Sequence, residues 1–417
     1  MLQCKTKWKK EKLGDLILFL RNGISNEQVD IYTDFPVTRI ETIADGKIDY
    51  NRAGHVEKAP EDYRIQQGDI LVSNINSQKH IGKVAIKDDD KVLYHGMNLL
   101  LMRPNEIIDS KFLFYVLNYN KQYFERIASP AVNQSSINQT DMQKMEFIIP
   151  KDKVEQTKIA DILSTCDEVI EKTEETIEKY KQIKAGMMQD LFTRGLGENG
   201  KLRPTYTQAP DLYKYSKELD RHIPKEWDVK TFKDICYVNQ GLQIAISNRH
   251  KRNGVNRYLY ITIQYLNTLK NPEYIENPQQ SVICSKEDIL MTRTGNTGFV
   301  VTGVEGVFHN NFFKINYDKE SLDKDYMIYY LNQEEIQKMI LDKAGLTTIP
   351  DLSHGDFYSL PILIFDKSEQ TKISNTLLTI DKKIDIEEQY LNKYKQIKQG
   401  LMKRLLTPPA DAEIVEE

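Results

Sequence analysis

Residues 155–193 read EQTKIADILSTCDEVIEKTEETIEKYKQIKAGMMQDLFT, and residues 369–407 read EQTKISNTLLTIDKKIDIEEQYLNKYKQIKQGLMKRLLT. The two stretches align without a gap at an offset of 214 residues, and 20 of the 39 aligned positions are identical. A repeat this long and this similar indicates that the chain consists of two related halves.

Each copy of the repeat predicts one long helix. Apolar side chains recur in steps of four and three residues, the spacing of a coiled-coil seam, and neither copy contains proline. Because the two copies share their register, we expect the helices to pair with each other; the alternative is that each helix covers only its own domain. The residues expected to pair the helices are Leu163, Ile170, Ile177 and Tyr180 in the first copy and Leu377, Ile384, Leu391 and Tyr394 in the second.

The two predicted helices carry opposite net charges. The first has five basic and nine acidic side chains, and the second has eight basic and five acidic ones. Opposite charge favours pairing, but exposed ion pairs contribute only about 0.2–1 kcal/mol each, so the apolar seam is expected to supply most of the association. Ile162, Val169 and Ile183 fall outside the seam and are expected to be available to partner proteins.

The segments before the helices repeat more weakly. Asp69-Ile70-Leu71 parallels Asp288-Ile289-Leu290, and Tyr115 parallels Tyr329. Short β-rich runs alternate with turn clusters, and a helix-like stretch follows at 111–127 and 325–343, so the fold class expected is α+β with an internal pseudo-twofold repeat. The expected divisions are a first globular domain (1–154), a first helix (155–193), a connector (194–222), a second globular domain (223–368), a second helix (369–407) and a disordered tail (408–417).

Composition limits the classes of function. The 417 residues include 57 Lys and Arg against 61 Asp and Glu, so a site for a polyanion must be a local patch. The four cysteines are far apart and form no C-x-x-C pair, so neither a disulfide framework nor a zinc site is expected. The longest apolar run, Leu16 to Leu20, is far shorter than a membrane span. A reducing cytoplasm is the location expected.

These features resemble the specificity subunit of type I restriction–modification systems. The resemblance covers nearly the whole chain and rests on the twin EQTKI…KYKQIK helices, the Asp-Ile-Leu turns before each glycine loop, and Ile223-Pro224-x-x-Trp227 at the entry to the second domain. It implies two target recognition domains, each reading half of a bipartite DNA site, and two conserved spacer helices that pair as an antiparallel coiled coil.

The resemblance also implies the partners. They are double-stranded DNA, methyltransferase (modification) subunits, expected to number two, and, in systems that also cleave DNA, restriction/translocase subunits. The chain itself is expected to be non-catalytic and to hold no cofactor or metal. S-adenosylmethionine and ATP with Mg²⁺ are expected on the partner subunits.

Polar and basic stretches in each globular domain are the candidates for DNA contact. Arg and Lys suit guanine, Asn and Gln suit adenine, and hydroxyl groups suit phosphate. The alternatives are a solvated charged loop, an ordinary turn or a polar loop. The candidates in the first domain are Ser73, Asn74, Asn76, Gln78, Lys79, Lys83, Asn133, Gln134 and Asn138. The candidates in the second domain are Arg249, Lys251, Arg252, Arg257, Arg293, Thr294 and Asn296.

Motifs for chemistry are missing from the sequence. It contains no N/D-P-P-F/Y loop of a base methyltransferase, no G-x-x-x-x-G-K-[S/T] phosphate loop and no H-E-x-x-H string. An enzyme is therefore not expected. The remaining rival is a coiled-coil adaptor whose globular domains bind proteins, and the basic loops and the divergence between the two domains argue against it.

Overall fold

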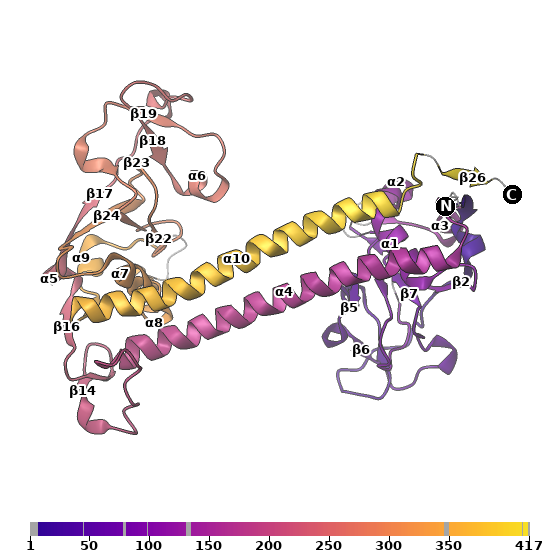
Figure 1. The fold of residues 1–417 in the computed structure, drawn as a ribbon, viewed down its shortest axis with the longest axis horizontal. Helices are drawn as coiled ribbons and strands as arrows, with labels where there is room; N and C mark the ends of the chain where they lie inside the picture. The colour runs from indigo at the N-terminus through magenta and orange to yellow at the C-terminus, as the bar shows by residue number, and fades with distance from the viewer. Residues whose placement is uncertain are drawn as a thin grey trace, which may run out of the picture. The chain divides into compact units, whose positions relative to one another are not determined.

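A computed structural model describes residues 7–44, 46–77, 81–97, 99–130, 135–345, 350–410 and 412–415. The chain forms two compact units. Unit 1 consists of Met1–Glu175 and Glu388–Glu417, and unit 2 of Thr176–Glu387. Each unit therefore contains one globular domain and a segment of each repeated helix (Figure 1).

The repeated sequences form the two long helices that they predict. Helix α4 spans Lys153–Arg194 and helix α10 spans Lys367–Leu405, within two residues of the predicted ends (Figure 1). Within the described ranges, no helix has the long apolar run that a membrane span requires.

Unit 1 is built around a four-stranded antiparallel sheet in the order β2-β10-β7-β9. Two three-stranded sheets have the orders β13-β1-β26 and β11-β12-β8, and β3-β6 and β4-β5 are two-stranded. Its strands are β1 (Lys7–Lys12), β2 (Ile17–Asn22), β3 (Pro36–Val37), β4 (Ile43–Ala44), β5 (Lys47–Ile48), β6 (Gly54–His55), β7 (Ile70–Val72), β8 (Ile75–Asn76), β9 (Val84–Ile86), β10 (Leu100–Pro104), β11 (Ser129–Pro130), β12 (Ser135–Ser136), β13 (Glu146–Pro150) and β26 (Glu413–Val415). Its short helices are α1 (Ser110–Tyr119), α2 (Lys121–Ile127) and α3 (Gln139–Gln143).

Unit 2 repeats this plan. Its four-stranded antiparallel sheet, β17-β24-β21-β22, corresponds to the central sheet of unit 1, and a second sheet has the order β19-β18-β23-β20. Its strands are β14 (Tyr213–Ser216), β15 (Arg221–Pro224), β16 (Asp228–Thr231), β17 (Cys236–Gln240), β18 (Arg257–Ile261), β19 (Tyr274–Glu276), β20 (Ile283–Cys284), β21 (Ile289–Thr292), β22 (Val300–Val301), β23 (Gly306–Phe308), β24 (Phe312–Tyr317) and β25 (Pro361–Ile364). Its helices are α5 (Phe232–Ile235), α6 (Ile263–Thr268), α7 (Lys324–Leu331), α8 (Glu334–Ala344) and α9 (His354–Tyr358).

The long helices run antiparallel within each unit. In unit 1, Lys395 and Lys398 of α10 pair with Glu174 and Asp167 of α4, so rising numbers on one helix meet falling numbers on the other. In unit 2, Lys184 pairs with Asp381, and Lys383 lies over the ring of Tyr180. The expected pairing of the repeats as antiparallel helices is therefore present in both units.

The eight residues predicted to pair the helices lie within α4 and α10, and all of them are at least half-buried. Buried seam residues are Leu163, Ile177, Leu377 and Ile384, and half-buried ones are Ile170, Tyr180, Leu391 and Tyr394. The first turns of α4 join the core of unit 1, and the first turns of α10 join the core of unit 2. Ile162, Val169 and Ile183 are 45%, 37% and 40% exposed, so the outward aliphatic positions do face solvent.

The repeated Gln-Thr pair explains why the same motif begins both helices. The buried Gln156 amide accepts a hydrogen bond from Asp109 N (2.9 Å) and donates one to Pro150 O (2.9 Å), while the Thr157 hydroxyl donates to the Asp109 carboxylate. Asp109 in turn caps the start of α1. In the second motif, Gln370 accepts from Asp323 N and the Thr371 hydroxyl donates to the Asp323 carboxylate, and Asp323 caps α7. Each motif therefore fixes a long helix to its own globular domain.

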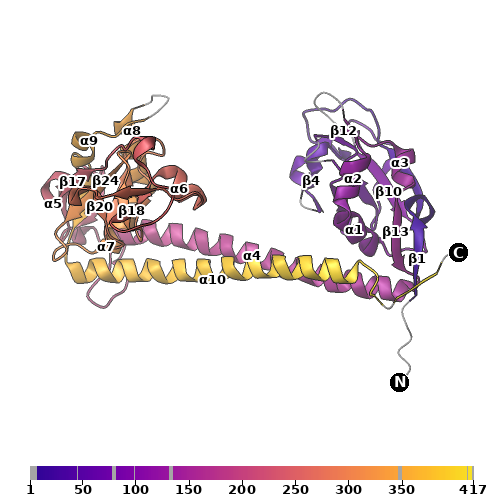
Figure 2. The ribbon, with the colours of Figure 1, turned by 90° about the horizontal axis from the view of Figure 1, so that it is seen from above.

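A Tyr-Asp-Lys triad occurs once in each unit. In unit 1, the Tyr115 hydroxyl donates to Asp167 Oδ2 (2.7 Å), and Lys398 Nζ lies 2.5 Å from Asp167 Oδ1. In unit 2, Tyr329 and Lys184 contact Asp381 in the same way, both at 2.5 Å. Burial, followed by the nearby carboxylate, raises the pKa of Tyr115, so its phenol stays protonated and donates. Each triad joins one globular domain to both long helices, and Figure 2 shows α1 above the helices in unit 1.

The structure differs from the sequence prediction at the ends of the globular domains. The tail 408–417 is predicted to be disordered, but Glu413–Val415 form β26, parallel to β1, because that edge of β1 offers unpaired backbone groups. The connector 194–222 is not only exposed, because Leu219 is buried and Arg203 pairs with Glu369 at 2.5 Å. The helix predicted at 111–127 breaks at Asn120, between α1 and α2.

The triads predict a loss of stability. Replacing Asp381→Asn removes the charge opposite half-buried Lys184, at an expected cost of ~1–2 kcal/mol, which lowers the Tm of a unit of this size by roughly 2–8 °C. The measurement is thermal unfolding of the full chain, with Asp385→Asn, an exposed carboxylate on the same helix, as the matched control. Equal Tm values for the two variants would show that the triad does not stabilise unit 2.

Candidate nucleic-acid interface

In unit 1, two of the polar segments singled out in the sequence come together. Strand β8, in the loop after β7, pairs with β12, which pairs with β11. Ile137 N also donates to Asn74 O at 2.8 Å. Residues 73–77 and 135–138 therefore form one surface, which we call platform 1. Figure 2 shows β12 at the end of unit 1 that is farthest from α4.

Most of the described candidates in platform 1 shape the loop. Ser73 is buried, its backbone N–H donates to Lys83 O (2.8 Å), and its hydroxyl accepts from Asn76 Nδ2 (3.2 Å). Asn74 is buried, and its Nδ2 donates to Ile137 O at 3.4 Å. Exposed Asn138 caps α3 by accepting from Asp141 N.

Of the remaining candidates in the first domain, only Lys83 lies within the described residues. Lys83 is half-buried, and its ammonium group has no partner among the described residues. Gln78, Lys79, Asn133 and Gln134 lie outside the described residues. Direct base contacts from this domain therefore remain a prediction.

Unit 2 builds the corresponding surface from the loop after β21 and the segment before α9. Leu352 N donates to Arg293 O at 2.9 Å, as Ile137 N does to Asn74 O in unit 1, and Thr294 bridges to Asp351. Residues 292–298 and 350–353 therefore form platform 2. Its side-chain environment differs from that of platform 1, because Arg293 forms a two-bond ion pair with the Asp351 carboxylate, at 3.0 and 2.8 Å.

The basic stretch 247–257 divides into paired and free cations. Arg249 donates to Ile244 O (3.0 and 2.7 Å) and pairs with Glu273 (3.0 Å), so its guanidinium group is engaged inside the unit. Arg257 pairs with Glu276 at 3.2 Å. Lys251 and Arg252 are exposed, and no partner of their cationic groups is found among the described residues. These two residues are therefore the cations available to a phosphate backbone.

The sequence does not predict the acidic partners of Arg249 and Arg293. Arg249 and Glu273 are 24 residues apart, and Arg293 and Asp351 are 58 apart. Each basic stretch lacks acidic residues when it is read alone, so local composition overestimates its free positive charge. Pairing across strands is a tertiary property, and no local pattern signals it.

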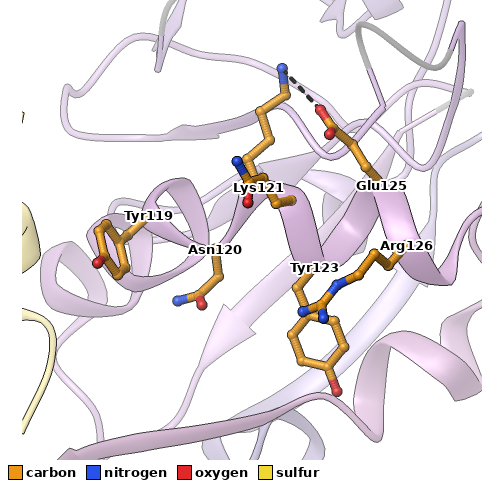
Figure 3. A pocket seen from close by; sticks show the side chains of 7 residues that line it. Tyr119, Asn120, Lys121, Tyr123, Glu125 and Arg126 are labelled. Carbon is orange, nitrogen blue, oxygen red and sulfur yellow. Dashed lines mark ion pairs between the residues drawn. The ribbon is translucent and has the colours of Figure 1, made fainter.

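A pocket of about 620 Å³ lies at the corner between α1 and α2 in unit 1 (Figure 3). Its charged side chains interact with their neighbours: Lys121 pairs with Glu125 at 3.7 Å, and the Arg126 guanidinium lies 5.2 Å from the Tyr123 ring centre. None of the candidate DNA-contact residues lines it. The pocket is therefore not part of either platform.

His95 and His309 align when the two halves of the sequence are compared, and His95 is a structural residue. His95 is fully buried, its Nε2 lies 3.1 Å from Arg21 O, and burial lowers its pKa to about 4. Its ring is therefore neutral at pH 7. Burial also lowers the pKa of His309. Among the described residues, no group of three or more His, Cys, Asp or Glu side chains is arranged to hold a metal ion.

Comparison with known proteins gives consistent matches over nearly the whole chain. A family model for the type I restriction modification DNA specificity domain matches residues 5–182 and 224–396. The MjaX type I restriction enzyme specificity subunit of Methanocaldococcus jannaschii is 33% identical over 411 residues, which cover 96% of this chain and 93% of that protein. The MjaVIII specificity subunit of the same organism is 21% identical, over 96% and 92% of the two chains.

Solved structures share the fold. The crystal structure of the type I restriction–modification S subunit from M. genitalium matches with a TM-score of 0.62 and 18% identity, covering 98% of this chain and 99% of that one. A chain from a study of complex assembly and conformational transition of the type I R-M system matches with a TM-score of 0.56 and 14% identity, covering 96% and 97%. Both share the duplicated architecture described above.

The division between free and paired cations predicts different effects of substitution. Arg252→Ala and Lys251→Ala should each weaken binding to all DNA sequences and reduce the salt dependence of log K by about one unit per lost phosphate contact. Arg249→Ala should instead lower the Tm by removing the support of its loop. The measurements are DNA titrations of the assembled complex at several salt concentrations, together with thermal unfolding. Unchanged affinity and salt slope in Arg252→Ala would exclude that residue from the interface.

Proposed function

The chain belongs to the specificity subunits of type I restriction–modification systems, and from this premise we propose that each unit reads one half of a bipartite DNA site through its own platform. The chain is the non-catalytic DNA-recognition subunit of such a system. The observation that carries the proposal is the duplication: the same two segments meet in both units, but their side chains differ.

Physical reasoning supports two independent readers. The backbone hydrogen bond between the two segments is the same in both platforms, so the scaffold is shared. The residue that accepts it is Asn74 in unit 1 and Arg293 in unit 2, and their side chains bond different partners, so the loop beside each is fixed differently. Base specificity resides in side chains, while phosphate contacts position the protein. A common scaffold with different side chains is therefore suited to two different half-sites.

The long helices are proposed as the docking surface for the partner subunits. Ile162 and Val169 in unit 1 and Ile183 in unit 2 are exposed aliphatic side chains outside the seam. Methyltransferase subunits are partners of this family, and two of them, one for each unit, match the duplication. S-adenosylmethionine, and ATP with Mg²⁺ where a restriction subunit is present, are proposed to bind those partner chains.

The experiment is an exchange of one reader. Residues 223–360 are replaced by the equivalent segment of a relative with a different DNA site, and the chimera is expressed with its methyltransferase subunit. Sequencing of methylated bases in the host DNA gives the new site. One half-site should change to that of the donor, while the other half should stay the same.

The matched control is the reciprocal exchange of residues 7–150, which should change only the other half-site. A chimera that assembles and methylates DNA but changes both half-sites together would contradict the two-reader proposal. If the unmodified complex methylated DNA without any sequence preference, the proposal that this chain reads DNA would be wrong.

A further inference from the structure

The loop after β21 presents an exposed amide side chain that has no partner within the described part of unit 2. Asn296 is exposed, and its amide makes no hydrogen bond with any residue that the structure describes. The loop around it is closed by its own hydroxyl groups: Thr292 Oγ1 accepts from Phe299 N at 2.9 Å, and Thr297 Oγ1 donates to Pro350 O at 2.8 Å. Asn296 therefore projects from a loop that is fixed on both sides.

The Arg293–Asp351 ion pair ties this loop to the segment before α9. Arg293 Nε lies 3.0 Å from Asp351 Oδ1, and Arg293 Nη2 lies 2.8 Å from Asp351 Oδ2. A two-bond pair of this kind fixes orientation as well as distance, which a single hydrogen bond does not. The backbone of Arg293 is fixed too, because its N–H donates to Asn311 O at 2.7 Å and its carbonyl accepts from Leu352 N.

This ion pair is a feature of unit 2 alone. At the corresponding position unit 1 has Asn74, whose Nδ2 donates to Ile137 O at 3.4 Å and whose buried Oδ1 has no partner among the described residues. The two platforms therefore share their backbone contact and differ in the side chains that fix it. The difference lies next to the loop that each unit would present to DNA.

We propose that Arg293 and Asp351 form a positioning pair that holds Asn296 for direct contact with a base in the half-site read by unit 2. This inference rests on the proposed function. An Asn amide offers a donor and an acceptor side by side, which match the N6 and N7 groups of adenine in the major groove. Arg293 is assigned to holding the loop and not to reading a base, because its Nε and Nη2 groups are bonded to Asp351. A loop held in one shape also loses less conformational entropy on binding.

The test uses the full chain assembled with its methyltransferase subunit. Sequencing of methylated DNA gives the discrimination at each base pair of both half-sites, and the exchange of residues 223–360 identifies the half read by unit 2. The variants are Asn296→Ala, Asp351→Asn and the conservative Asp351→Glu. The matched control is Asp228→Asn, which removes the acidic partner of a different cation in unit 2, Lys214 (3.4 Å).

Asn296→Ala should reduce discrimination about tenfold or more at one base pair of the half-site read by unit 2. Asp351→Asn should reduce discrimination at the same base pair, Asp351→Glu should largely restore it, and Asp228→Asn should leave it unchanged. The half-site read by unit 1 should keep its full selectivity in every variant, which a general loss of folding would not allow.

Full selectivity in Asn296→Ala would overturn the assignment of the base contact, and full selectivity in Asp351→Asn would overturn the positioning role. Equal loss at both half-sites with a lower Tm would show that the pair is only structural. These outcomes differ from failure of the proposed function, in which the unmodified complex shows no half-site that follows unit 2 on exchange.

Discussion

The structure depends on the Tyr-Asp-Lys triad, which occurs once in each unit and uses both long helices each time. The aspartate of one helix accepts a hydrogen bond from the tyrosine of its own globular domain and forms an ion pair with the lysine of the other helix. Asp167 and Asp381, Lys184 and Lys398, and Tyr115 and Tyr329 are all 214 residues apart. Because each helix supplies the aspartate of one triad and the lysine of the other, a change in either helix affects both units.

The surfaces that are proposed to read DNA do not share residues between the two units in this way. Gly23 and Gly241 stand at the start of equivalent loops. An added Cβ would lie only 2.0 Å from Gly96 O at the first position and 2.2 Å from His309 O at the second, so neither position has room for a side chain. From these shared positions the loops diverge: the first continues with acidic Glu27, Asp30 and Asp34, and the second with the basic stretch 247–257. The two halves therefore retain one framework while these loops differ in the charge of their side chains.

The sequence predicts those parts of the structure that depend on local periodicity. The helix ends are correct within two residues because the seam spacing and the Gln-Thr motif are local signals. The loops of both platforms could also be selected from composition. The sequence does not predict that Arg249, Arg257 and Arg293 form ion pairs with carboxylates from distant segments. These pairs depend on which segments lie side by side in the folded chain. The strand at Glu413–Val415 was missed for the same reason, because it exists only by pairing with β1.

The most direct test of the central claim is hydrogen–deuterium exchange of the assembled complex on DNA duplexes in which only one half-site is altered. Amide exchange reports local protection segment by segment, so each platform is observed separately. The account predicts that altering the half read by unit 2 removes DNA-dependent protection from residues 292–298 and 350–353 and leaves it at 73–77 and 135–138. Loss of protection in both platforms together, or protection of neither on the intact site, would contradict the claim that each unit reads its own half.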